Sequence, residues 1–197
     1  VTRQRGAVPD GFDGGVDRAA GPVAQHHQER NIEDGDGVFE TLRVRNGIIR
    51  FQALHHERLA LGCRRLAIDV DLAHLWAHTR QLASRHGDAM VKVQVTRGDA
   101  TARGYAPVGS ETARIISSVF APPRAADLPP QLCAVTLESQ LGENPQLAGI
   151  KHCNRLEQVL ARASMRGTEA FEGLMASSSG LVISGTMSNL YLELEGE

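Results

Sequence analysis

Apolar and polar residues alternate in several short segments of the chain, and this period of two predicts β-strands. The clearest segment is "MVKVQVT" at 90–96, while "ARIISSVF" at 113–120 is more continuously apolar, as expected for a more buried strand. "VFETLRV" at 38–44 is followed by "RNGI" and then by "IRFQ". Because Asn-Gly readily takes the two positive φ values of a tight turn, these segments predict a β-hairpin.

A helical period of apolar or small residues begins after the hairpin. It covers 59–66 and 72–83, and the second segment ends before Gly87, a residue type that often terminates helices. Residues 121–131, "APPRAADLPPQ", then contain four prolines in eleven residues, which is typical of a linker between domains. Residues 1–27 show neither period, and we expect them to form a loop.

The part of the chain beyond the proline cluster is predicted to contain short strands and one helix. The strands cover 132–138, 170–176, 181–183 and 190–194. The helix follows Asn154, which is expected to cap it together with Glu157, and Gly167 is expected to end it. Its predicted apolar face comprises Leu156, Val159, Leu160 and Ala163. The pattern as a whole predicts an N-terminal α/β domain over 28–120, the linker over 121–131 and a second domain over 132–197.

Length and composition exclude several classes of protein. With 197 residues, 42% of them hydrophobic, the chain is long enough to bury a substantial core. A net charge of −2 gives no basic surface for nucleic acid, and no apolar run approaches the roughly 20 residues that span a membrane. The N-terminus lacks the apolar segment of a secretory signal. Three widely spaced cysteines without a CxxC pair, Cys63, Cys133 and Cys153, favour a reducing cytoplasm.

Lysine is rare in this chain. Of the 21 basic residues only Lys92 and Lys151 are lysines, and the other 19 are arginines. An amine can lose its proton and attack a carbonyl, which a guanidinium cannot do. Lys151 lies just before the predicted helix, where a rigid element would hold a reacting side chain. On the residues alone, a lysine whose stem covers apolar surface is the more frequent alternative, and Lys92, which alternates with valines, is interpreted as an ordinary strand lysine.

Metal-binding motifs are incomplete in the sequence. His74 and His78 are one helical turn apart, but neither an HExxH motif nor a third ligand accompanies them. "DGDG" at 34–37 lacks the later ligands of a calcium loop. We therefore expect no metal site.

Five motifs together resemble one family of enzymes. "GDGVFETLRV", "HHERL", "VTRGDATARGYAP", "NPQLAGIKHCNRLEQVLARA" and "GTMSNLYL" occur in the order seen in the class IV pyridoxal-phosphate enzymes, and in particular in the 4-amino-4-deoxychorismate lyases. The resemblance covers about residues 28–195. It implies a two-domain fold of the D-amino-acid aminotransferase type, α/β or α+β in class. Pyridoxal 5'-phosphate would lie between the domains, and 132–197 would begin the cofactor-binding domain.

The resemblance also implies roles for individual residues. Lys151 matches the lysine that binds the cofactor covalently, and is therefore the expected catalytic amine. Arg58 matches an arginine that binds the cofactor phosphate, a role suited to a fixed fork of donors. Arg103 and Tyr105 match positions on the substrate side that could meet the carboxylates of aminodeoxychorismate.

Other matches concern the cofactor ring and the extent of the chain. Ser188 and Asn189 match the loop that flanks the cofactor ring and phosphate. Counting back from Asn189, Ser184 stands where the family has an acidic residue paired with the pyridine nitrogen. Related enzymes continue beyond the position of Glu197, so the second domain is expected to be incomplete, and 1–27 do not resemble the family's opening strand.

The function implied is that of a lyase converting 4-amino-4-deoxychorismate to 4-aminobenzoate and pyruvate in folate biosynthesis. The expected partners are this small-molecule substrate and a second copy of the chain in a cytoplasmic homodimer, with neither nucleic acid nor membrane. One alternative is a class IV transaminase for branched-chain or D-amino acids. Phe39 and Thr41 favour the lyase, because D-amino-acid enzymes usually have tyrosine at the first position and branched-chain enzymes glycine at the second. Another alternative is an inactive, truncated remnant of the family.

Overall fold

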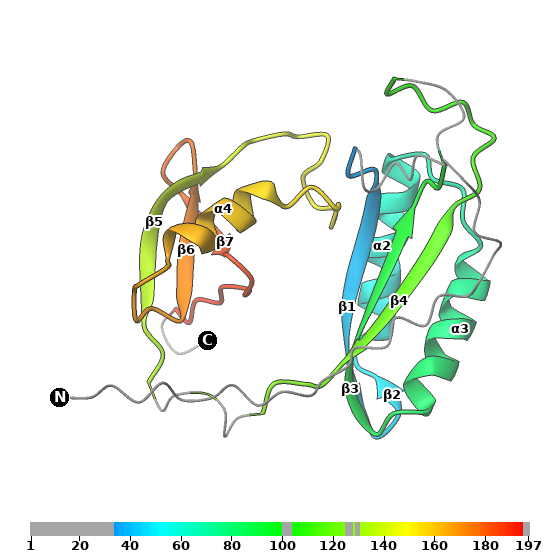
Figure 1. The fold of residues 1–197 in the computed structure, drawn as a ribbon, viewed down its shortest axis with the longest axis horizontal. Coiled ribbons are helices and arrows are strands. Elements are labelled where there is room, and N and C mark those ends of the chain that lie inside the picture. The colour runs from blue at the N-terminus through cyan, green and yellow to red at the C-terminus, as the bar shows by residue number, and fades with distance from the viewer. Residues whose placement is uncertain (1–33, 100–103, 125–127, 129–130, 195–197) are drawn as a thin grey trace, which may run out of the picture.

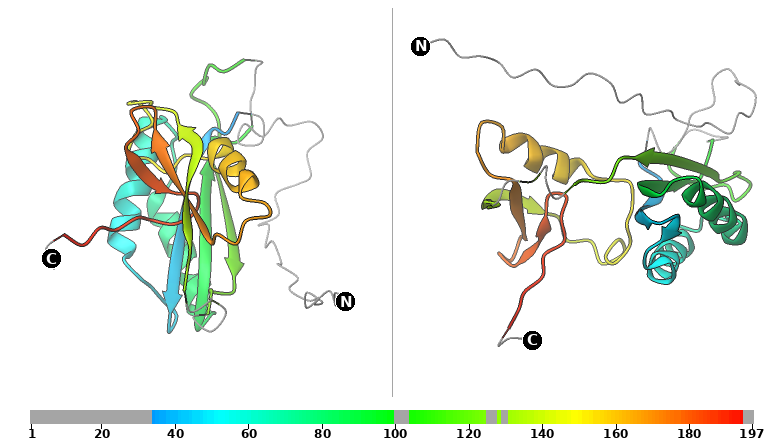
Figure 2. Two further views of the ribbon diagram at one scale, coloured as in Figure 1. Left: turned by 90° about the vertical axis from the view of Figure 1, so that its left-hand side faces the viewer. Right: turned by 90° about the horizontal axis from the view of Figure 1, so that it is seen from below.

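The computed structural model describes residues 34–99, 104–124, 128 and 131–194. Two groups of elements follow one another along the chain, and Figures 1 and 2 show them as two neighbouring bodies. Each body contains a sheet, so the protein is of mixed α/β class, as predicted. The loop predicted over 1–27 lies outside the described residues, and the domain boundaries drawn around the proline cluster stay a prediction.

The first sheet is antiparallel, with the strand order β2-β1-β3-β4. Its strands are β1 (Gly37–Arg45), β2 (Ile48–Ile49), β3 (Asp88–Thr96) and β4 (Arg114–Phe120). The predicted hairpin turn is confirmed, since Asn46 and Gly47 have φ values of 50° and 74°. The second strand of the hairpin is shorter than predicted, because Phe51 takes a φ of 53° and the chain turns there into a helix.

Helices α2 (Gln52–Arg65) and α3 (Leu72–Ser84) lie on one face of this sheet (Figure 1) and confirm the two predicted helical segments. The core between them is apolar and includes Val38, Leu42, Val91, Val93, Leu59, Leu75 and Trp76, all at most 3% exposed. Successive side chains of a strand point to opposite faces. Phe39, Thr41 and Lys92 therefore lie on the face away from the helices, and Thr41 is directly paired with Lys92.

The second sheet has the order β5-β6-β7. Its strands are β5 (Ala134–Leu141), β6 (Glu172–Ser177) and β7 (Val182–Gly185), the first pair parallel and the second antiparallel. Helix α4 (Leu156–Ser164) packs against β5 and β6 and forms the crossover that a parallel pair requires. The strand predicted over 190–194 is wrong: these residues have no regular structure, because no described strand pairs with them.

Helix α4 ends at Ser164 with Met165 as its C-cap, before the predicted Gly167, and its start also differs from the prediction. Asn154 does not cap the helix, because its amide lies against Gly35, and the N-cap is Arg155, without a side-chain hydrogen bond. The Glu157 carboxylate accepts instead from the backbone N–H of Gly142, at 2.9 Å. The predicted apolar face is also not buried here: Leu156, Val159 and Leu160 are 58–76% exposed, and the helix buries Ala161.

A short extended segment before α4 joins the two bodies. The N–H of Phe39 donates to the carbonyl of Lys151 and the N–H of Cys153 donates to the carbonyl of Gly37, both at 2.9 Å. Val38 and His152 form the β-bridge between these bonds. The backbone of Lys151 is therefore fixed to β1, although more than a hundred residues separate them in the sequence.

Candidate active site

The side chain of Lys151 lies over the ring of Phe39, with Nζ 4.7 Å from the ring centroid. Two further cations share this ring: Lys92 Nζ at 4.9 Å and Arg155 Cζ at 5.6 Å. The three cations come from three places in the chain, namely β3, the segment before α4 and the N-cap of α4. The site is therefore assembled by strand pairing and by the junction between the two bodies.

The environment of Lys151 favours the neutral amine. Burial lowers the pKa of the Lys151 ammonium most, and the neighbouring charges of Arg155 and Arg58 lower it further. Glu40 acts in the opposite direction, and Lys92 adds a smaller lowering effect. A lysine of lowered pKa has more of its amine free to attack a carbonyl or to accept a proton near neutral pH.

Glu40 is a buried carboxylate on the opposite, helix-facing side of β1. It is fully buried, and Arg58 binds it in a fork, with Nε to Oε1 and Nη2 to Oε2 both at 2.6 Å. His55 Nδ1 lies 2.8 Å from Oε2. Burial would raise the pKa of the Glu40 carboxyl, but the bonds from Arg58 and His55 outweigh burial and lower it. Glu40 therefore stays ionised and fixes the orientation of Arg58.

Arg58 keeps donors for a second partner. Glu40 uses Nε and one proton of Nη2, which leaves Nη1 and the other Nη2 proton outside this pair. The Arg58 side chain is 45% exposed, so these donors can reach a ligand. The charges that act on Lys151 are thus the three cations Arg58, Lys92 and Arg155 and the single carboxylate of Glu40, and the excess of positive charge suits a small molecule bearing phosphate or carboxylate groups.

The remaining predicted residues lie on other segments. Tyr105 is 85% exposed and lines a hollow with His152 and Asn154, next to the Lys151 segment. Arg103 lies outside the described residues. Ser184 lies near the end of β7, opposite Met175 of β6.

Ser188 and Asn189 lie on the exposed loop that follows β7. The charged groups that change the pKa of Lys151 are Glu40 of β1, Arg58 of α2, Lys92 of β3 and Arg155. None of these groups is on that loop. The structure thus brings Arg58 to Lys151, and leaves Ser184, Ser188 and Asn189 on the second sheet and the loop that follows it.

Three residues near Lys151, namely Lys92, Glu40 and Arg155, were not predicted from the sequence to belong to the site. Lys92 was interpreted as an ordinary strand lysine, although the scarcity of lysine drew attention to it as much as to Lys151. Glu40 and Arg155 gave no local signal, because a charged residue in an alternating strand or at a helix start is usually solvated. Here contacts between distant segments bring these charges near Lys151, and Glu40 is fully buried.

The sequence predicted neither a metal site nor a membrane-spanning segment. Among the residues that it describes, no three or more His, Cys, Asp or Glu side chains are gathered so that they could hold a metal ion. Within the same residues, no helix has the length and apolar character needed to cross a membrane.

Comparisons with known proteins place the chain in a family. The profile of the family described as amino-transferase class IV matches residues 37–197. An aminodeoxychorismate lyase of Vibrio harveyi is 36% identical over 169 residues, which cover 83% of this chain and 61% of that protein. A D-alanine aminotransferase of Bacillus licheniformis is 28% identical over 184 residues, covering 84% and 58%. The crystal structure of 4-amino-4-deoxychorismate lyase from Pseudomonas aeruginosa has a TM-score of 0.74 and 41% identity, covering 89% of this chain and 66% of that one.

The chain therefore belongs to the class IV aminotransferase family, whose members depend on pyridoxal phosphate. Within that family it is similar to the aminodeoxychorismate lyases, at 36–41% identity, which confirms the resemblance seen in the motifs. The chain spans about three fifths of the length of the curated relatives that it matches.

The residues around Lys151 fit this cofactor. A partly buried amine of lowered pKa suits an aldehyde, and an excess of cations suits a phosphate. One feature does not match: Ser184 supplies no negative charge for the pyridine nitrogen.

Proposed function

We propose that this chain, with pyridoxal phosphate, acts as an aminodeoxychorismate lyase that releases pyruvate and 4-aminobenzoate. The observation that carries the proposal is the position of the Lys151 amine, held over Phe39 between Lys92 and Arg155 with a lowered pKa. The identity of 36–41% with lyases, against 28% with the D-alanine aminotransferase, supports the lyase rather than a transaminase.

Each residue of the cluster has a part in the proposal. Lys151 would hold the cofactor aldehyde, and the free donors of Arg58 would hold its phosphate. When bound, pyridoxal phosphate supplies an electron sink for charge that develops on the substrate. Ser188 and Asn189 would contact its ring and phosphate from the second sheet's side.

The proton transfers are assigned to Lys151. Once the substrate amine had replaced it at the aldehyde, Lys151 would again have a free amine, whose pKa is lowered by burial and by Arg155. That amine would take the proton from the ring carbon that bears the substrate nitrogen and deliver it to the departing enolpyruvyl group, which leaves as pyruvate. Lys92 and Arg155 flank the same ring and would bind substrate carboxylates, as would Arg103 and Tyr105. This cluster would orient the substrate so that its enolpyruvyl group leaves and an aromatic ring forms.

The test begins with the purified chain and pyridoxal phosphate. Borohydride reduction followed by peptide mapping is expected to place a pyridoxyl adduct on Lys151, and Lys151→Ala is expected to remove both the adduct and pyruvate release from aminodeoxychorismate. Lys92→Ala is the matched control, because it removes the other lysine of the cluster and should leave the adduct on Lys151. An adduct on Lys92 instead would overturn the assignment.

Amino transfer is the second candidate, favoured by the match to the D-alanine aminotransferase. The same preparation can be assayed for keto-acid formation from D-alanine and from branched-chain amino acids. We propose pyruvate release from aminodeoxychorismate as the faster reaction. A cytoplasmic homodimer, implied by the family resemblance, completes the proposal and can be checked by sedimentation of the purified protein.

A further inference from the structure

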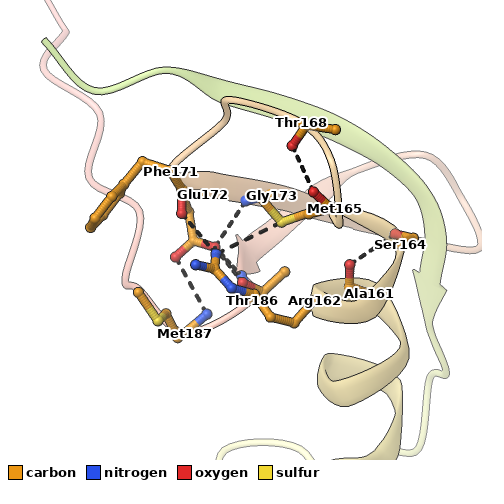
Figure 3. Close-up of polar contacts among 10 residues, drawn as sticks. All are labelled: Ala161, Arg162, Ser164, Met165, Thr168, Phe171, Glu172, Gly173, Thr186 and Met187. Carbon is orange, nitrogen blue, oxygen red and sulfur yellow. Dashed lines mark hydrogen bonds and ion pairs between the residues drawn. The ribbon is translucent and has the colours of Figure 1, made fainter. Parts of the chain in front are cut away.

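Glu172, the first residue of β6, binds the turn that follows β7 (Figure 3). Its Oε1 accepts from the backbone N–H of Thr186 at 3.0 Å and also from the Thr186 hydroxyl. Its Oε2 accepts from the N–H of Met187 at 3.4 Å, and the Ser188 hydroxyl donates to the same carboxylate. Three successive residues of one turn are therefore bonded to one side chain.

The groups around Glu172 stabilise an ionised carboxylate. The residue is 8% exposed, and its Oε1 also accepts from the N–H of Gly173 at 2.9 Å. Arg162 of α4 provides a counter-charge, with Nη1 at 3.8 Å from Oε1. A Cβ at position 185 would lie 2.9 Å from the carboxylate carbon and from Oε2 of Glu172, so a larger residue there would displace this carboxylate.

The charge state of Glu172 follows from these contacts. Burial alone would raise the pKa of the Glu172 carboxyl, but bonds from the Ser188 and Thr186 hydroxyls and from backbone N–H groups lower it to about 2. Glu172 is thus an anion whose oxygens are occupied by donors from the protein itself. It cannot supply the acidic partner of the pyridine nitrogen that Ser184 lacks, and its function must lie in what it holds.

The held segment carries the residues of the second domain that are proposed to contact the cofactor. Ser184 precedes the turn, Ser188 belongs to it and Asn189 follows it. The loop beyond β7 has no regular structure, and no described strand pairs with it. Besides Glu172, two backbone bonds hold the turn: the N–H of Thr186 donates to the carbonyl of Gly173 at 3.0 Å, and the N–H of Gly185 donates to the carbonyl of Ser188 at 3.1 Å.

We propose that Glu172 is a positioning residue, which acts through the turn at 186–188 to hold Ser184, Ser188 and Asn189 in place for the cofactor. This inference rests on the proposed function, because it assigns those three residues to pyridoxal phosphate. Glutamine at position 172 would keep the shape but turn one acceptor into an NH2 donor that faces N–H and O–H donors. The turn would then lose at least one of its bonds and move away from β6.

The experiment compares Glu172→Gln with the wild-type chain and with Glu169→Gln, a matched control at an exposed glutamate three residues earlier. Pyridoxal phosphate affinity is titrated by visible absorbance, and amide hydrogen exchange is measured without cofactor. Glu172→Gln is expected to weaken affinity at least tenfold and to speed exchange at Thr186 and Met187. Exchange in β1 and β3 should not change, and excess cofactor should still label Lys151 after borohydride reduction.

A second variant covers the case in which Glu172→Gln does not fold. Thr186→Val removes only the hydroxyl bond and is expected to change affinity and exchange in the same direction by a smaller factor. Faster exchange in a folded variant with unchanged affinity would overturn the positioning role, and so would unchanged exchange. If the wild-type chain binds no pyridoxal phosphate, the proposed function fails, and the exchange comparison by itself decides whether Glu172 holds the turn.

Discussion

Lys92 and Lys151, the two lysines of this chain, lie over the same phenylalanine ring, with their Nζ atoms 4.9 and 4.7 Å from the centroid of Phe39. Two ammonium groups close to one ring oppose each other's ionisation, and a neutral amine on one of them relieves this repulsion. The pKa of Lys151 is lowered, chiefly because Lys151 is buried and lies near Arg155.

Removing a neighbouring cation should raise the pKa of Lys151. Lys92→Met is expected to raise it slightly and Arg155→Met more, because Arg155 ranks above Lys92 among the charges that lower it. The pKa can be followed from the pH dependence of reductive methylation at Lys151, measured by peptide mass spectrometry without cofactor. Arg80→Met, at an exposed position of α3, is the matched control. A lower pKa in either cluster variant would contradict the electrostatic account.

Breaking the pair between Glu40 and Arg58 should destabilise the first sheet and its helices. Glu40→Gln is expected to reduce the free energy of unfolding by about 2 to 3 kcal/mol, less than for a fully buried pair because Arg58 can reach water. Asp88→Asn is the control, since its pair with Arg43 is exposed and should contribute less than about 1 kcal/mol. Urea unfolding measures both, and equal losses would show that burial of Glu40 adds nothing.

Stability should fall in acid through Glu172. Its folded pKa of about 2 lies below the ordinary 4.5, so its contribution is complete above pH 4.5 and is lost as pH falls towards 2. The loss is at most about 3 kcal/mol. The Glu172→Gln variant should be less stable than the wild-type chain at neutral pH, and its stability should change less between pH 5 and pH 2. Urea unfolding midpoints measured across this pH range test both expectations. The same slope in both proteins would assign the acid transition to another group, such as Glu40.

Ser184 should matter more for amino transfer than for lyase activity. A hydroxyl does not stabilise a protonated pyridine nitrogen as a carboxylate does, and transamination needs the stronger electron withdrawal that this proton gives. Ser184→Glu is therefore expected to increase keto-acid formation from amino acids more than pyruvate release. The two reactions are assayed separately in a chain extended to the full domain length of its relatives. Equal changes in both, or no change, would show that Ser184 does not contact the ring nitrogen.

Local chemistry was enough to predict most of the elements from the sequence. Asn46 and Gly47 form the predicted turn because positive φ is a property of those residue types. Strands β1 and β3 follow the period of two and helices α2 and α3 the helical period, since each pattern depends on a single buried face. The family could also be predicted, because its motifs occur in order along the chain.

Errors arose where a local pattern competed with a distant partner. Asn154 and Glu157 were predicted to cap α4, but the first lies against Gly35 and the second bonds to Gly142. Residues 190–194 have the pattern of a strand, yet a strand also needs a neighbour to bond, and the described chain offers none. Pattern alone does not report which partner is available.

The site itself was determined by tertiary structure. The sequence identified Lys151 by its residue type and motif, but its lowered pKa depends on Arg58 and Arg155, which strand pairing and the junction with β1 bring to it. In the same way, nothing in the sequence distinguishes Glu172 from other glutamates. It can bond to the turn at 186–188 only because β7 pairs with β6. Residue type sets what a side chain can do, whereas burial and neighbouring charge, which arise from contacts between distant segments, decide what it does here.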